Sequence, residues 1–140
     1  MDMLPIKLVV LTLLAGMSIA VADSVLIANP GVAESALTKN QVESMLLGKS
    51  KNWPSGSRVK LCIAKSGDAS ASGIKTYASK TLAQFNLYWR KLAFSGKGKP
   101  PNQVGSDADV LAYVAANPGA IGFVTAGQST DGAKVISIQE

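Results

Sequence analysis

Histidine is absent from the sequence and cysteine occurs only once, and these shortages exclude several kinds of chemistry. Without histidine the chain cannot build a Ser-His or Cys-His nucleophile pair, and the usual zinc sites lose a principal ligand. Cys62 has no second cysteine to pair with, and its place in an apolar run predicts a buried, inert thiol. Because no metal-ligand cluster or convergent acid pair replaces these groups, we expect neither an enzyme nor a bound cofactor.

Charged residues are also scarce, at 16% of 140 residues, and acidic ones are the minority. Fourteen lysines and arginines against nine aspartates and glutamates give a net charge of +5. Such a surface suits an anionic ligand, nucleic acid or an anionic membrane, although simple solubility is the commoner reason for a charge of this size. Nucleic-acid binding is not expected, because a nucleic-acid-binding face needs aromatic side chains interleaved with its basic ones. Here only Trp53 stands near the basic residues.

The one long apolar run lies at the N-terminus, in residues 4–22. It ends in Ala-Val-Ala at 20–22, which fits the small-x-small cleavage pattern of a secretory signal peptide. The alternative is an uncleaved membrane anchor, but polar residues interrupt the run, which is barely long enough to span a bilayer. We therefore expect a signal peptide at 1–22 and an exported, periplasmic domain at 23–140 that does not span the membrane in its mature form.

Hydrophobic periodicity in the remaining chain predicts four strands separated by helices. The expected order of elements is β-α-β-α-α-α-β-β, which indicates an α/β fold with a mixed β-sheet flanked by helices. Asp131-Gly132, between the last two strands, is a hairpin-type turn signal. The strands are predicted at 24–28, 58–64, 120–124 and 135–138. The helices are predicted at 39–47, from 74 to a break near 80, from this break to about 94, and from 107 to a stop signal, Asn-Pro-Gly, at 117–119.

Three of these helices carry recognisable start signals. Thr-x-x-Gln capping boxes begin at Thr38 and at Thr81, and the second one predicts the helix break near residue 80. Asp107 and Asp109 superficially resemble a catalytic pair of carboxylates. We interpret them as capping residues instead, because carboxylates in the first turn of a helix favour its dipole.

The most informative local feature is the small-residue loop at 65–73, which joins a predicted strand to a helix start. Free backbone N–H groups and serine hydroxyls at the positive end of a helix can hold phosphate or sulfate, and Lys65 would add charge. The alternative is that Ser70 or Ser72 merely caps the helix and the rest is a turn. Asp68 would repel a dianion, yet it could accept the proton of a monohydrogen species.

Three segments, in order, resemble the phosphate-binding proteins of the bacterial phosphate ABC transporter. Residues 37–49 with Trp-Pro-Ser-Gly at 53–56 resemble the entry to that family's second lobe. Tyr-Trp to Phe-Ser-Gly in 88–101 resembles its Trp…Phe-x-Gly segment, and 118–124 resembles its Gly-Ala-Ile-Gly-Tyr-Val strand. The resemblance covers nearly all of the chain after residue 22. It implies a single lobe of a type 2 periplasmic-binding-protein fold, and hence a short, single-lobe member.

The resemblance also implies a ligand site, because the loop at 65–73 falls where the family has an Arg-x-x-x-Ser-Gly-Thr phosphate loop. Lysine stands where the family has arginine, so the bidentate guanidinium fork is lost. The implied residues for phosphate or another oxyanion are Lys65, Ser66, Ser70, Ala71 and Ser72.

One lobe cannot enclose an anion by itself, since full-length members close two lobes on the ligand. A homodimer or an envelope protein would have to supply the second surface. We therefore expect an exported phosphate- or oxyanion-binding module linked to phosphate uptake or sensing. The alternative is an envelope interaction protein that keeps the lobe fold without a ligand site.

Overall fold

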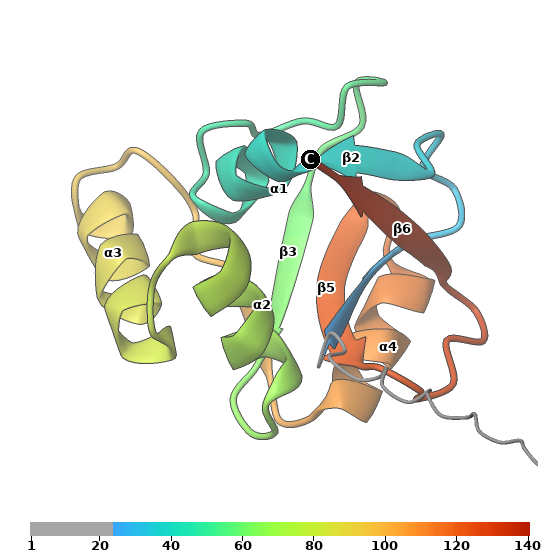
Figure 1. The fold of residues 1–140 in the computed structure, drawn as a ribbon. Coiled ribbons are helices and arrows are strands. Elements are labelled where there is room, and N and C mark those ends of the chain that lie inside the picture. Colours follow the sequence, from blue (N-terminus) through green and yellow to red (C-terminus); the bar gives the residue numbers. More distant parts are fainter. Residues whose placement is uncertain (1–23) are drawn as a thin grey trace, which may run out of the picture.

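The computed structural model describes residues 24–140, so the predicted signal peptide at 1–22 lies outside the described residues. These residues form four helices and six strands in the order β1-β2-α1-β3-α2-α3-β4-α4-β5-β6. Figure 1 shows how they are arranged. The strands are β1 (Ser24–Ala28), β2 (Ala36–Thr38), β3 (Lys60–Ala64), β4 (Asn102–Val104), β5 (Ala120–Thr125) and β6 (Lys134–Gln139). The helices are α1 (Lys39–Leu46), α2 (Ala69–Ala78), α3 (Leu82–Phe94) and α4 (Asp107–Ala116).

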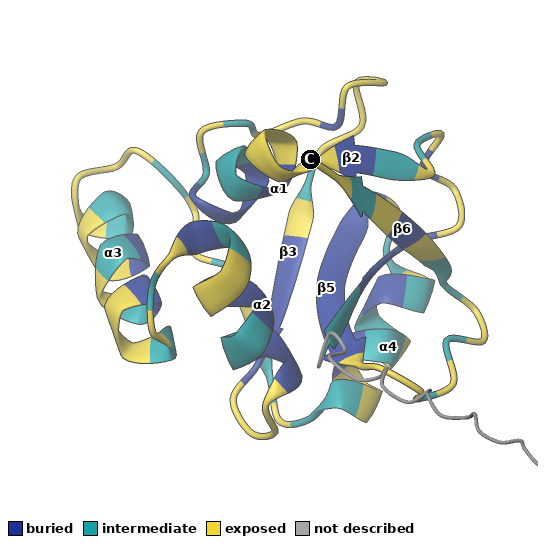
Figure 2. Cartoon of the chain, in the orientation of Figure 1, coloured by how far each residue is buried: buried dark blue, intermediate teal, exposed yellow. Residues whose placement is uncertain are grey.

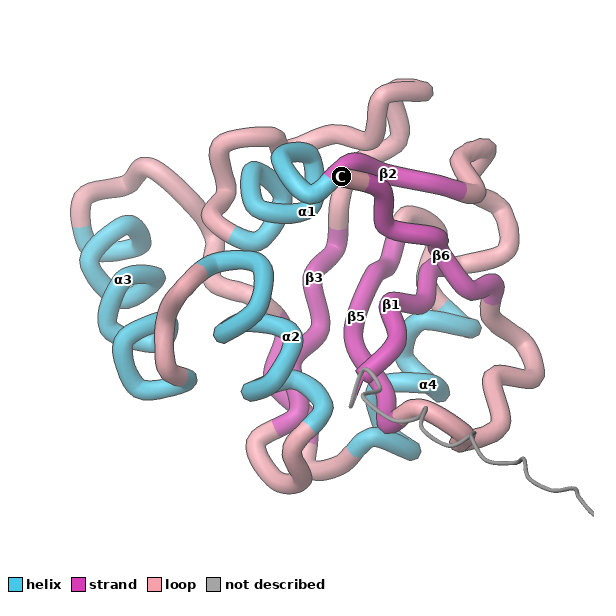
Figure 3. Tube along the Cα trace, viewed as in Figure 1, coloured by secondary structure: helices cyan, strands magenta, loops and turns pink. Residues whose placement is uncertain are grey.

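The six strands form one mixed sheet in the order β2-β6-β1-β5-β3-β4. Figure 3 labels five of them, from β2 to β3 in this order. Strand β3 is parallel to both β4 and β5, whereas β1 is antiparallel to β5 and β6. The predicted hairpin at Asp131-Gly132 is therefore wrong, because β1 lies between β5 and β6. The continuous apolar run of β1 suits a central strand, because such a strand is covered on both faces. Strands β5 and β6 pair on either side of β1 and not with each other.

Alternate residues of the central strands enter two separate cores. Leu61 and Ile63 of β3 pack in the larger core with α1, α2 and α3, whereas Cys62 and Ala64 pack in the smaller core with Val110 of α4. This period of two is the natural consequence of a pleated strand buried on both faces. Figure 2 shows the buried strands β3 and β5 between α2 and α4. The predicted fold, an α/β lobe with a mixed sheet and flanking helices, is confirmed.

The start of α2 differs from the prediction, because residues 69–73 are helical rather than part of a loop. Glycine and serine have poor helix propensity, but tertiary packing overrides it here. A Cβ on Gly73 would lie 2.5 Å from Cδ1 of the buried Phe123 ring, so only glycine lets α2 approach β5 this closely. The loop between β3 and α2 is therefore only residues 65–68.

The start of α3 confirms the predicted capping box and helix break. Ser79 adopts a left-handed conformation after α2, and the Thr81 hydroxyl oxygen accepts a hydrogen bond from Gln84 N at 3.1 Å. The buried face of α3 then docks on the end of α1. Trp89 Nε1 donates to Leu46 O at 3.0 Å. This contact holds α3 against the edge of the larger core.

Candidate functional site

Three parallel strands end at one edge of the sheet, and two helices begin there. Strands β3, β4 and β5 have their last residues at Ala64, Val104 and Thr125, and α2 and α4 follow β3 and β4 after short connections. We call this region, made of residues 65–68, the first turns of α2 and α4, and Thr125, the helix-start edge. In α/β sheets, ligands bind outside the carboxyl ends of the strands. The helix-start edge is therefore the candidate site.

The loop at 65–68 is fixed against the end of β4. Lys65 N donates to Val104 O at 2.9 Å, and Ser66 N donates to Gly105 O at 3.2 Å. The Ser66 hydroxyl donates to the same carbonyl oxygen. Although the side chains of Lys65 and Ser66 are exposed, their backbone is thus held in place. Gly67 then turns the chain with a φ of +84°, a conformation that glycine adopts without strain.

Of the predicted site residues, Ser70 is turned away from solvent. Its side chain is 1% exposed, and its Oγ accepts a hydrogen bond from Ala64 N at 2.9 Å. The bond joins the start of α2 to the end of β3, so Ser70 has a structural role here. Ala71 and Ser72 are half-buried in the first turn of the helix. Their part in anion binding, like that of Ser70, stays a prediction.

Helix α2 begins without a side-chain cap. Asp68 occupies the N-cap position but its carboxylate makes no capping hydrogen bond, and the first bond along the helix axis runs from Ser72 N to Asp68 O at 2.8 Å. The first backbone N–H groups of any helix lack intrahelical acceptors, and the helix dipole makes this end positive. The N–H groups at the start of α2, next to Lys65, can therefore donate hydrogen bonds to the oxygens of an anion.

Asp107 of α4 faces the same loop, which sequence reasoning did not foresee. Its Oδ2 accepts a hydrogen bond from Thr125 N at 2.9 Å and another from the Thr125 hydroxyl. Its Oδ1 is buried and has no hydrogen-bond partner among the described residues. A Cβ placed on Gly67 would lie 3.4 Å from this oxygen, so the unpartnered acceptor lies beside the loop.

The interpretation of Asp107 and Asp109 as carboxylates at a helix start agrees with their position in the first turn of α4, where Ser106 caps the helix. It is incomplete for Asp107, whose carboxylate also closes the end of β5. No local pattern in the sequence reveals this, because the partner, Thr125, is supplied by the following strand.

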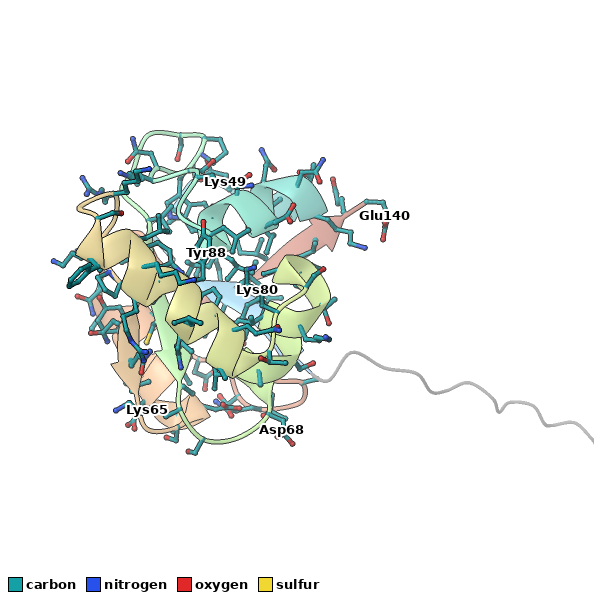
Figure 4. The ribbon with its side chains drawn as sticks, turned by 90° about the vertical axis from the view of Figure 1, so that its left-hand side faces the viewer. Lys49, Lys65, Asp68, Lys80, Tyr88 and Glu140 are labelled. Atoms are coloured by element: carbon teal, nitrogen blue, oxygen red, sulfur yellow. The ribbon has the colours of Figure 1, made fainter. Side chains whose placement is uncertain are left out.

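Charge at the helix-start edge is mixed. Lys65 is accompanied there by three carboxylates, those of Asp68, Asp107 and Asp109. Such a set of carboxylates repels any anion, but an anion that carries a proton can offset this repulsion by donating a hydrogen bond to a carboxylate oxygen, which sulfate cannot do at neutral pH. Figure 4 shows Lys65 and Asp68 at the same end of the domain. A depression of about 200 Å³ lies beside Lys65, against Leu82 and Asn86 of α3.

A metal site is not supported by the described part of the chain. Within residues 24–140, no group of three or more His, Cys, Asp or Glu side chains is placed to hold a metal ion.

Across the same residues, no helix has both the length and the apolar character needed to cross a bilayer.

Structure comparison finds a likeness in fold to parts of larger proteins. An ABC-type phosphate transport receptor from Vibrio cholerae aligns with a TM-score of 0.56 at 16% identity, over 83% of this chain and 46% of that one. A protein described as a phosphate ABC transporter substrate-binding protein from Clostridium perfringens, with bound phosphate, aligns with a TM-score of 0.63 at 13% identity, over 83% and 44%. PstS from Borrelia burgdorferi aligns with a TM-score of 0.54 at 16% identity, over 83% and 47%.

These likenesses concern the fold, and they confirm the predicted single lobe of a periplasmic-binding-protein type. The chain spans less than half the length of each of these three structures. No protein-family model matches the sequence, and a search of curated proteins finds no matching relative.

Proposed function

We propose that the chain is an exported, single-lobe module that holds a protonated oxyanion, phosphate in the first place, at the helix-start edge. The observation that carries the proposal is the buried Asp107 Oδ1, which has no partner among the described residues and lies beside Gly67 at the start of α2. Monohydrogen phosphate has the matching groups: one hydroxyl to donate to Asp107, and further oxygens to accept from the helix N–H groups and Lys65.

Export to the periplasm rests on the signal-peptide pattern of residues 1–22, and it agrees with the fold of the transport receptors found by comparison. A single lobe leaves an anion at the helix-start edge open to solvent on one side, so a second surface is needed to enclose it. We propose that a second copy of the chain or an envelope protein supplies it. Binding in the wild-type monomer is then expected to be weaker than in a closed, two-lobe protein.

Thermal melting of the purified protein tests this function. A ligand at a hundred times its Kd adds about 2.7 kcal/mol to the stability of the folded state. For a domain of this size that corresponds to a rise in Tm of roughly ten degrees or more. We expect millimolar phosphate to raise Tm, and sulfate at equal ionic strength to have little effect, because sulfate carries no proton at neutral pH.

Two lysine variants make the test site-specific. Lys65→Gln removes the cation beside the loop and should reduce the phosphate response. Lys75→Gln removes an exposed charge from the last turn of α2 and should leave the response unchanged. Equal responses to phosphate and sulfate, or equal loss in both variants, would contradict the proposed site.

A second candidate function is an interaction protein of the envelope that keeps the lobe without a ligand. The mixed charge of the helix-start edge favours it, because three carboxylates stand there against one lysine. Under this alternative, neither phosphate nor sulfate changes Tm at any concentration, although the protein is folded and monodisperse.

A further inference from the structure

A large groove opens at the opposite end of β3 from the helix-start edge. It has a volume of about 1180 Å³ and lies between two walls, the segment from Gly48 to the start of β3 and the loop that follows α3. Lys60, the first residue of β3, lines the groove, whereas Ala64 ends the strand at the helix-start edge. At the rise of a β-strand, these two positions are about 13 Å apart. Figure 4 shows Lys49, next to groove-lining residues, at the opposite end of the domain from Lys65.

The charge of the groove has one sign. Among its lining residues there are five basic side chains and no aspartate or glutamate. All five are exposed, and the one ion pair recorded within residues 24–140 joins Lys39 to Glu140, outside the groove. A concave surface lined with one sign of charge concentrates the field and attracts counter-ions. The five residues are Lys51, Arg58, Lys60, Lys97 and Lys99.

A hydrogen bond connects the two walls of the groove. Lys51 Nζ donates to Lys97 O at 3.2 Å, which joins the segment after α1 to the loop after α3. Behind this contact, Gly98 packs so closely on the ring of Trp89 that a Cβ there would lie 3.0 Å from the indole. The groove is therefore part of the folded domain and does not depend on a free loop.

The uncharged lining indicates the chemistry of the ligand. Apolar and ring side chains line the groove together with the cations, among them Val59, Pro100, Pro101 and Tyr113. Sugar units present apolar ring faces together with acidic groups at their edges, whereas a polyphosphate chain has no apolar surface. The volume, about 1180 Å³, exceeds the roughly 300–1,000 Å³ usual for small-molecule pockets, so the groove has room for a chain segment.

We propose that this groove binds a segment of an acidic polysaccharide, with the lysines and Arg58 pairing its carboxylate or sulfate groups and the apolar wall contacting its rings. A flat anionic membrane fits the geometry less well, because the cations line a concavity. Among the described residues, the most exposed large apolar side chain is Phe94, which is 96% exposed at the end of α3 and does not line the groove. The inference does not depend on phosphate binding at the helix-start edge.

Calorimetric titration of the full chain with a size-defined heparin oligosaccharide tests the proposal. The wild type should bind, and rising salt should weaken the binding because it screens exposed charges. Lys60→Gln/Lys99→Gln should weaken binding about tenfold, as expected when two exposed ion pairs are lost. The matched control, Lys39→Gln/Lys75→Gln, loses the same charge outside the groove and should change the affinity by less than about twofold.

Three outcomes would overturn the proposal. Equal weakening by both double variants would mean attraction to net charge alone. Equal affinity for charge-matched linear polyphosphate would mean that the apolar wall plays no part. Binding to vesicles of phosphatidylcholine and phosphatidylglycerol that is lost in Phe94→Ser, without heparin binding, would identify a membrane face instead.

Lysine footprinting on the wild type keeps the proposal testable if the double variant does not fold. Acetylation followed by mass spectrometry should show that heparin protects Lys60 and Lys99 from modification, and that Lys39 and Lys75 remain reactive. Uniform protection of all four lysines, or none, would contradict the groove as the binding site.

Discussion

Asp107 Oδ2 accepts a hydrogen bond from Thr125 N at 2.9 Å, which ties the start of α4 to the end of β5. The Thr125 hydroxyl donates to the same oxygen, so the carboxylate is fixed by two bonds. As a result, Oδ1 is held in a buried position beside Gly67. A carboxylate held in this way is a pre-positioned hydrogen-bond acceptor at the edge of the sheet. It also has a structural role, because it joins α4 to β5.

Asp107→Ala is predicted to lower the free energy of unfolding by about 1–2 kcal/mol in phosphate-free buffer, because a charged acceptor and a favourable dipole contact are lost. Asp109→Ala, at an exposed position in the same helical turn, loses a similar dipole contact and the hydrogen bond from the Ser106 hydroxyl, and should cost less, about 0.5–1 kcal/mol. Urea unfolding of the two variants measures the difference. Equal costs would show that the bonds to Thr125 contribute nothing beyond the helix dipole.

Gly73→Ala is predicted to destabilise the protein, although alanine is the better helix former. The added methyl group would meet the Phe123 ring at 2.5 Å, and overpacking of this kind costs about 1–3 kcal/mol against a propensity gain of about 1 kcal/mol. Thermal unfolding should give a net loss of Tm. Ser72→Ala, one position earlier in α2, serves as the control and should be nearly neutral. A stabilised Gly73→Ala protein would contradict the close packing of α2 on β5.

Thr81→Ala is predicted to cost about 1 kcal/mol, since it removes the acceptor for Gln84 N at the start of α3. The control is Thr76→Ala, an exposed position within α2 where alanine should be neutral or slightly stabilising. Chemical denaturation compares the two substitutions of the same residue type. A similar effect at both positions would mean that the capping box does not stabilise the break between the helices.

The pH dependence of stability should reveal the ionisation of the Cys62 thiol on unfolding. Burial raises the pKa of the Cys62 thiol, partly opposed by the hydrogen bond from Asn102. The unfolded thiol ionises near pH 8.5 while the folded one stays protonated, so stability is full below that pH and falls as pH rises through the raised pKa. Between pH 8 and 10, the wild type should lose up to about 1.4 kcal/mol per pH unit more than Cys62→Ala. Parallel stability curves for the two proteins would show that the thiol does not titrate on unfolding.

Local signals carried much of the fold prediction. The capping boxes predicted at Thr38 and Thr81 both form. Each of these signals acts within one helical turn, so all the residues that form the cap are neighbours in the sequence. Strand β1 was recognised for a similar reason, because its apolar run is continuous.

The missed features depend on residues that are distant in sequence. The two short edge strands, β2 and β4, have exposed residues and no apolar alternation, so only their partners β6 and β3 define them. The helical start of α2 depends on Phe123, fifty residues beyond Gly73. The position of Asp107 depends on Thr125.

The candidate site was located from the sequence only in part. The predicted loop does lie at the sheet edge where ligands bind in such folds, with Lys65 and Ser66 exposed on it. Sequence could not show that Ser70 points inward, because its hydrogen bond to Ala64 N requires the strand and helix to be packed together. The concentration of acidic groups around Lys65 likewise arises only when α4 is placed beside the loop.

The most direct test of the central claim is a titration of the ¹⁵N-labelled protein with phosphate, followed by amide chemical shifts. The account predicts saturable shifts at Gly67 and in the first turn of α2, with little response to sulfate. No shifts at these amides would contradict phosphate binding at the helix-start edge. Shifts confined to residues 96–101, which line the basic groove, would contradict it equally, because the anion would then be held away from the helix-start edge.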